Sequence, residues 1–260
     1  MITFIRLAGC LFFFLLAFLF YSCADKTEPP EPTMAERCQL NDRATTYYEH
    51  LLTAYEDSCK SCLQALLESW HQNKPPQTIP DSMVQIFNLY EAFFTPWNLR
   101  RIIFYRDSVS YEGSEYYMIQ PGFSYNTNYN SDITKPDNVI EDFRPPMAVD
   151  SIKYIYYDAD YEQALSCFLV GEISSRQNFL PADERNRRKL FLENHFRVVG
   201  RFNAFLYDYI THPKIGYINF NQALDTAIIS YRIEYYGYSA LMIRENNNWK
   251  LIKYELLWAD

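Results

Sequence analysis

Cys59 and Cys62 are the residues best able to do chemistry in this 260-residue chain, because thiols with two residues between them can exchange between dithiol and disulfide. Redox pairs of this kind usually lie where a strand opens into a helix, where the helix start stabilises the thiolate. Here the apolar pattern predicts both cysteines in mid-helix, on the apolar stripe. The usual Trp before and Pro within such a pair are also absent. The pattern therefore favours two buried small side chains, or half of a structural disulfide with Cys38 or Cys167.

Other catalytic patterns are missing from the sequence. A zinc site needs three or four converging ligands, whereas the four histidines are scattered along the chain. There is no Gly-x-Ser-x-Gly elbow, and 7 glycines leave little room for a phosphate-cradling loop. We therefore expect no catalytic residue, no metal site and no cofactor.

Two stretches carry candidate binding residues. Residues 121–150 are rich in Asn, Asp, Pro and Tyr and are interpreted as a long loop, in which Tyr125 and Tyr129 could stack on the sugars of a glycan. The same rings could equally plug a core or form a protein interface. The second stretch is a basic patch at residues 185–189, and we interpret it as a solvated helix face paired with Asp183 and Glu184.

The first 22 residues form a separate segment of the chain. An apolar run from Leu7 to Tyr21 follows Arg6 and has no polar face. A transmembrane helix needs about 20 apolar residues, so the run is too short to be one. A basic residue followed by a short apolar run instead fits a secretory signal peptide.

The end of this segment resembles the lipobox of bacterial lipoproteins, because the small Ser22 precedes Cys23. The resemblance implies a signal peptide at residues 1–22 and lipidation of Cys23. It also implies an anchor and flexible spacer at residues 23–33, where Pro and Glu suit an extended chain. Phe20 and Tyr21 are bulkier than the family's usual residues. Cys10 has the better local match, but cleavage there would leave the apolar run attached, so we prefer Cys23.

Composition narrows the class of the remaining chain. Loss of residues 1–22 would remove one basic residue, Arg6, and no acid, taking the formal net charge from −8 to −9. An acidic chain is poorly suited to nucleic acid, whose binding depends on phosphate neutralisation by Lys and Arg. Aromatic residues make up 18% of the sequence, which favours a folded body. We expect residues 34–260 to form one domain.

Helical periodicity dominates the first part of that domain. Apolar residues at steps of three and four predict one helix from about Asp42 to His71 and a second from Asp81 to Phe94. Ser82 with Gln85 is interpreted as the capping box of the second helix. Further on, we predict strands at 101–105, 115–119 and 151–157, a helix from about Asp160 to 168, and another at 182–194.

The last 45 residues give the clearest strand pattern. Strands are predicted at 215–220, 227–236, 239–244 and 249–258, and period-two alternation between short turns favours an antiparallel meander with one covered face. Helices followed by a sheet indicate an α+β fold. We expect the N-terminal amphipathic helices to pack on the apolar face of this antiparallel C-terminal sheet.

This C-terminal part loosely resembles the end of the cone-shaped nuclear-transport-factor-like fold. It is more similar to uncharacterised Bacteroidetes-type exported lipoproteins in a pattern of four short stretches over residues 185–258. These are Thr211-His212-Pro213, Ile218-Asn219-Phe220-Asn221, Tyr231-Arg232 and a final Trp-containing strand. That group implies no activity and no catalytic residue.

These observations together predict a lipoprotein of the cell envelope, facing the periplasm or the surface. Its partners would be the membrane, through the lipid anchor, and a glycan or an envelope protein. The expected role is a non-enzymatic binding or assembly module. The alternative is an envelope enzyme, either a thiol oxidoreductase that acts through Cys59 and Cys62 or a hydrolase built on a cavity.

Overall fold

The computed structural model describes residues 32–104, 111–128, 136–147, 152–171, 179–200 and 207–259, and Met34–Asp260 form one unit. Cys23, Tyr129 and the proposed signal peptide lie outside the described residues. Within the described part, no helix is both long and apolar enough to cross a membrane.

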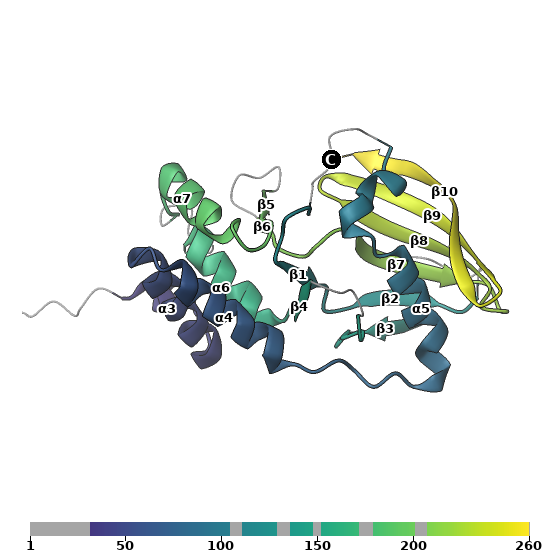
Figure 1. The fold of residues 1–260 in the computed structure, drawn as a ribbon, viewed down its shortest axis with the longest axis horizontal. Coiled ribbons are helices and arrows are strands. Elements are labelled where there is room, and N and C mark those ends of the chain that lie inside the picture. Colours follow the sequence, from purple (N-terminus) through teal and green to yellow (C-terminus); the bar gives the residue numbers. More distant parts are fainter. Residues whose placement is uncertain are drawn as a thin grey trace, which may run out of the picture. The chain divides into compact units, whose positions relative to one another are not determined.

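Helices and strands both contribute to this unit (Figure 1). The α-helices are α2 (Met34–Arg37), α3 (Asp42–Glu56), α4 (Lys60–Asn73), α5 (Val84–Phe93), α6 (Ala159–Val170) and α7 (Ala182–Leu192). Two 3-10 helices are η1 (Asp81–Met83) and η2 (Pro96–Arg101). The strands are β1 (Tyr116–Ile119), β2 (Phe123–Asn126), β3 (Asn138–Ile140), β4 (Lys153–Tyr156), β5 (Val199–Gly200), β6 (Tyr207–Asp208), β7 (Lys214–Phe220), β8 (Thr226–Ile233), β9 (Tyr236–Glu245) and β10 (Asn248–Ala259).

The largest sheet has six strands in the order β10-β9-β8-β7-β2-β3. Strands β7 to β10 form the predicted antiparallel meander, while β2 joins β7 in parallel. The α+β class is therefore confirmed. Alternation along β8 is also as predicted, because Ile229, Tyr231 and Ile233 are buried and the residues between them are only partly buried.

The sheet covers a core of its own, which we call the sheet core. Helix α5 packs on it, and the edge of the Phe93 ring meets the Tyr231 ring with centroids 4.9 Å apart. Phe123 of β2 and Phe143 lie in the same cluster, with ring centroids 4.8 Å apart. Such aromatic contacts add to the free energy gained from burial.

A second cluster, the helical core, lies among α3, α4, α6 and α7. Helix α3 packs against α4 and α6, and α6 packs against α7. The rings of Trp70 and Tyr161 stack with centroids 4.3 Å apart and join α4 to α6. The predicted packing on the large sheet thus applies to α5, whereas the first amphipathic segment packs against α6 and against strand β4.

Strands β1 and β4 belong to both cores. They pair in parallel as a separate two-stranded sheet. Because successive side chains of a strand point to opposite faces, Tyr117 and Ile119 enter the sheet core while Tyr116 and Met118 enter the helical core. Strand β4 divides in the same way, with Tyr154 and Tyr156 on one side and Ile155 on the other.

Several predicted elements differ from the structure. The helix predicted from Asp42 to His71 is two helices, and residues 121–150 contain β2 and β3 instead of one long loop. Ser82 makes no capping bond, because η1 precedes α5 and neither has a side-chain cap. Residues 96–101 form η2 where a strand was predicted to begin at 101.

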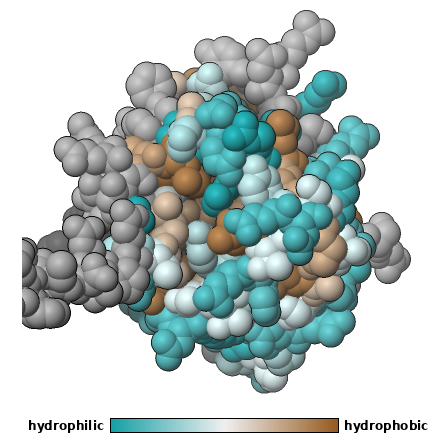
Figure 2. Space-filling view, turned by 90° about the vertical axis from the view of Figure 1, so that its left-hand side faces the viewer, coloured by the Kyte–Doolittle hydropathy of each residue, from teal (hydrophilic) through white to brown (hydrophobic). Residues whose placement is uncertain are grey.

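The helical side of the unit has a mixed surface. Figure 2 shows small hydrophobic patches separated by hydrophilic side chains on this face. Apolar side chains scattered in this way are ordinary for a protein surface. Hollows and clusters of polar groups are therefore better candidates for a functional site than these patches.

Candidate functional site

A hollow of about 480 Å³ lies against the large sheet, and we call it the sheet pocket. Ser230 and Arg232 alternate along β8 with buried residues, so they lie on the face opposite the sheet core. A smaller hollow of about 160 Å³ is lined by Ile228 of β8, Ser239 of β9 and Lys253 of β10. The full lining of the sheet pocket is Lys214, Ile215, Gly216, Ser230, Tyr231, Arg232, Tyr238, Leu257 and Trp258.

Two cationic side chains stand across from each other in this pocket. Lys214 of β7 and Arg232 of β8 are direct partners in the antiparallel ladder. Like charges in that position destabilise a sheet. Arg232 is held by Asp208, whose buried carboxylate lies 2.6 Å from the guanidinium. No carboxylate is among the described residues that line the pocket.

Trp258 gives the pocket an aromatic wall. Its Cα partner across the ladder is Gly237, and a Cβ placed on this glycine would lie 2.0 Å from the indole ring. The indole therefore rests against the glycine backbone, while 45% of Trp258 stays exposed to solvent. A register shift at Leu257 brings Trp258 opposite Gly237.

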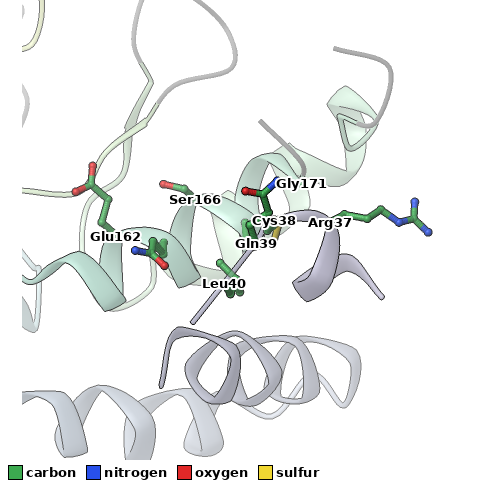
Figure 3. A pocket seen from close by; sticks show the side chains of 9 residues that line it. Arg37, Cys38, Gln39, Leu40, Glu162, Ser166 and Gly171 are labelled. Carbon is green, nitrogen blue, oxygen red and sulfur yellow. A yellow bond between two sulfur atoms is a disulfide. The ribbon is translucent and has the colours of Figure 1, made fainter. Parts of the chain in front are cut away.

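A second hollow, of about 450 Å³, lies between α6 and the segment that joins α2 to α3 (Figure 3). Its lining includes both cysteines of the Cys38–Cys167 disulfide. Figure 3 shows Arg37 and Glu162 toward opposite ends of this hollow. Because its charged groups do not converge on one point, we regard the sheet pocket as the stronger ligand site.

Cys59 and Cys62 form a disulfide at the turn between α3 and α4. Contrary to the mid-helix prediction, Cys59 is the N-cap residue of α4. The predicted helix breaks because Ser58 adopts a left-handed φ of 53°. The amide of Ser58 then donates to the carbonyl of Tyr55, and that of Cys59 to Ala54, which is the hydrogen-bond pattern of a Schellman motif.

A cluster of titratable groups lies between α4 and the strands β1 and β4. Nδ1 of His195 is 2.8 Å from the Glu115 carboxylate, and Nζ of Lys153 is 2.7 Å from Glu68. The hydrogen bond from His195 lowers the pKa of Glu115, and burial raises the pKa of Tyr116 to about 12. The other ring nitrogen of His195 is buried, with no hydrogen-bond partner among the described residues. The imidazole is therefore closed to a substrate, and we interpret the cluster as a brace.

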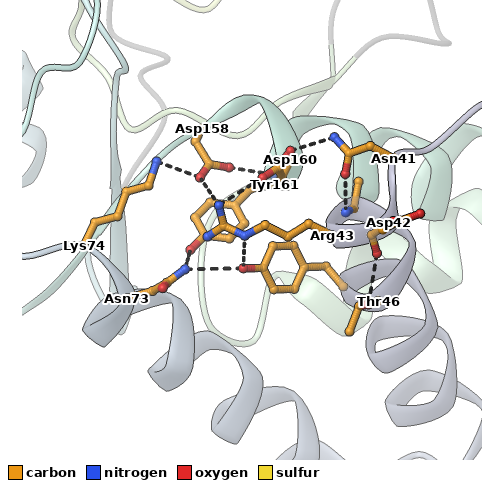
Figure 4. A network of polar contacts seen from close by, with 11 residues as sticks. Asn41, Asp42, Arg43, Thr46, Asn73, Lys74, Asp158, Asp160 and Tyr161 are labelled. Atoms are coloured by element: carbon orange, nitrogen blue, oxygen red, sulfur yellow. Dashed lines mark hydrogen bonds and ion pairs between the residues drawn. The ribbon is translucent and has the colours of Figure 1, made fainter.

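Figure 4 shows a polar network that ties three helix ends together. Asn41 caps α3 and also donates to Asp160, 2.8 Å away. Asp158 caps α6, where Asp160 was the predicted cap, and lies 2.8 Å from Nζ of Lys74 at the end of α4. Arg43 pairs with Asp160 at 3.1 Å. Each of these bonds satisfies a helix terminus or an ion pair, so the network is structural.

The predicted binding residues that the structure describes do not line the sheet pocket. Tyr125 lies in β2, half-buried against the sheet core, so its ring offers little face for stacking on a sugar. The basic patch lies on α7 as interpreted, with Arg187 paired to Asp183 and Glu184. The prediction of a solvated face is wrong for Arg185 and Arg188, which are buried and donate to the carbonyls of Leu180 and Phe168.

One signal for the sheet pocket is present in the sequence, in the alternation along β8. Ser230 and Arg232 alternate with apolar residues, which places them on the face opposite the core. Strand register decides two further features of the pocket. It pairs Lys214 with Arg232, and a bulge in it brings Trp258 over Gly237. Register between consecutive strands depends on the turn geometry and on bulges, which the single sequence did not define, so the pocket itself was missed.

Groups of three or more side chains able to hold a metal ion are absent from the described residues. Comparison of the chain with protein families, with curated proteins and with solved structures finds no match. A function for this protein must therefore be inferred from the arrangement of its side chains.

Proposed function

We propose that the protein is a lipid-anchored binding module of the cell envelope, and that its sheet pocket binds an acidic saccharide without catalysing a reaction on it. The observation that carries this proposal is the pocket lining, which combines Lys214, Arg232 and the exposed Trp258 in a chain of net charge −8. Two cationic side chains that line one hollow favour an anionic ligand.

Each part of the lining suits one part of such a ligand. An exposed indole face can stack on the apolar face of a sugar ring. The guanidinium of Arg232 suits a carboxylate or sulfate, and the hydroxyl of Ser230 suits a sugar hydroxyl. Asp208 holds the guanidinium in place, so little side-chain entropy would be lost on binding.

Binding is favoured over hydrolysis by the same lining. Most glycosidases place two carboxyl groups on either side of the scissile bond. The described residues that line the sheet pocket offer none, and the nearby Asp208 carboxylate is paired with Arg232. We therefore favour capture of the ligand over the alternative of a cavity-based hydrolase.

Calorimetric titration of the full chain in detergent with acidic oligogalacturonates tests the pocket. We expect Trp258→Ala and Lys214→Gln each to weaken binding about tenfold, equivalent to about 1.4 kcal/mol. Matched controls are Trp97→Ala, which removes an indole that is 51% exposed in η2, and Lys250→Gln on β10. Equal affinity for methyl-esterified, uncharged oligomers, or equal loss in the controls, would contradict the proposal.

The membrane anchor is a separate part of the proposal. The two disulfides support the export that it requires, since such bonds persist in oxidising compartments. Mass spectrometry of membrane fractions should find a chain that begins at an acylated Cys23. Cys23→Ala should abolish acylation, whereas the matched Cys10→Ala should not. A chain that retains Met1 in the membrane fraction, or an unmodified Cys23, would refute the anchor.

A further inference from the structure

The Cys59–Cys62 disulfide combines three features that a structural disulfide does not need. Cys62 is solvent-exposed, Cys59 is partly buried, and the pair opens a helix of 14 residues. The sulfur of Cys59 occupies the N-cap position and accepts a hydrogen bond from the amide of Cys62 at 3.2 Å. We propose that this disulfide is a thiol–disulfide exchange site that oxidises dithiols of exported polypeptides. The inference is independent of the sheet pocket.

The position of Cys59 favours its reduced form. A thiolate at the N-cap would retain the amide donor of Cys62 and would face the positive end of the α4 dipole. The hydroxyl of Ser61, 3.5 Å from the same sulfur, adds a second polar neighbour. The nearby charged side chains of Asp57 and Lys60 are exposed, so their effects are weakened by salt.

Exposure decides which sulfur is attacked. A substrate thiolate attacks the exposed sulfur of Cys62, the bond between the two protein sulfurs breaks, and Cys59 leaves as the stabilised thiolate. The second substrate thiol, as its thiolate, then attacks the substrate sulfur of this mixed disulfide and releases Cys62. The substrate gains one disulfide, the protein loses one, and the two substrate protons end on Cys59 and Cys62. A more oxidising disulfide restores the pair by the reverse exchange.

The Cys38–Cys167 disulfide provides an internal reference. Cys167 is buried in α6, with 2% of its surface exposed. Cys38 is partly buried and lines the second hollow, so a thiolate reaches this bond less readily than it reaches the exposed Cys62. The two bonds should therefore respond differently to the same reductant in the same molecule.

The test uses the full chain equilibrated in graded ratios of reduced to oxidised glutathione, followed by thiol trapping and peptide mapping. We expect Cys59–Cys62 to be half-reduced at a glutathione ratio at least about tenfold more oxidising than that for Cys38–Cys167. A second assay follows oxidation of a synthetic peptide that contains two cysteines. Its rate should fall at least tenfold in Cys59→Ala and in Cys62→Ala.

Two results would overturn the proposal. One is a Cys59–Cys62 pair that resists reduction as strongly as Cys38–Cys167. The other is peptide oxidation that is no faster with the folded chain than with the urea-unfolded chain, because the α4 start would then contribute nothing. Since either Ala substitution could perturb folding, circular dichroism of the variants and the Ser61→Ala variant accompany the assay. Ser61→Ala should keep the fold and slow the exchange by a smaller factor.

Discussion

Removal of the Cys38–Cys167 disulfide should destabilise the protein strongly, because the bond joins residues 129 positions apart. In the chain-entropy description, a cross-link restricts the unfolded state more as the closed loop lengthens. For a loop of this size the contribution to the free energy of unfolding is about 5 kcal/mol. The perturbation is the double variant Cys38→Ala, Cys167→Ala.

The second disulfide supplies a matched control with the same chemistry and a short loop. Cys59 and Cys62 are only 3 positions apart, for which the same relation gives about 2 kcal/mol. The variant Cys59→Ala, Cys62→Ala should therefore lose about 3 kcal/mol less than the first variant. Both changes replace two cysteines by alanine, so they share the same chemistry and differ in loop length. Cys167 is buried whereas Cys62 is exposed, so lost packing increases the difference in the same direction.

Urea unfolding under non-reducing conditions measures both quantities. The midpoint should fall further for the Cys38 and Cys167 variant, and its denaturant slope should rise because the unfolded chain expands and exposes more surface. Equal losses in the two variants, or an unchanged slope, would refute the reasoning from loop length. A loss confined to the Cys59 and Cys62 variant would refute it as well.

Three further substitutions test other features. Gly237→Ala should displace the Trp258 indole and weaken ligand binding. The melting temperature should change little, because the ring is half-exposed and can turn away. A binding titration paired with a thermal melt checks both results. Tyr111→Phe should cost about 2 kcal/mol in a urea titration, since the buried hydroxyl accepts from the His212 amide at 3.0 Å and lies 2.6 Å from its Nδ1. Glu115→Gln should make the free energy of unfolding fall less steeply in acid. The pKa of the hydrogen-bonded Glu115 carboxylate is lower in the folded state than its ordinary value of 4.5. Its contribution to stability is therefore present above pH 4.5 and is lost as the pH falls through the folded pKa. Unfolding free energies from pH 6 to pH 3 check it.

Much of the sheet was predictable because strand alternation is a local property. The meander from Lys214 onward follows the predicted alternation and two of its three predicted turns. The turn predicted between residues 236 and 239 is wrong, because the chain turns at residues 234–235 and Gly237 lies within β9. Along β10 the alternation fails at Ile252, where a bulge lets Leu251 and Tyr254 both pack on the sheet core. A bulge depends on the partner strand, so the single sequence did not indicate it.

The α3–α4 turn was missed for a related reason. Apolar residues keep helical spacing across the break, and Ser58 takes a left-handed conformation that Gly or Asn would have signalled. Because of that error, the sequence prediction placed Cys59 in the middle of a helix instead of at an N-cap. The prediction therefore argued against redox chemistry at Cys59 and Cys62. The sheet pocket was missed because its two cationic side chains come from two strands, and only the folded chain defines the register between them.

The shared strands β1 and β4 have a consequence for how the unit comes apart. Each strand presents alternate side chains to the two cores, so separation of β1 from β4 would expose apolar surface on both sides at once. Opening of either core at these strands therefore removes burial from the other core. We therefore expect the helical core and the sheet core to unfold together as one cooperative unit. A substitution that destabilises β1 or β4 should lower the stability of both cores.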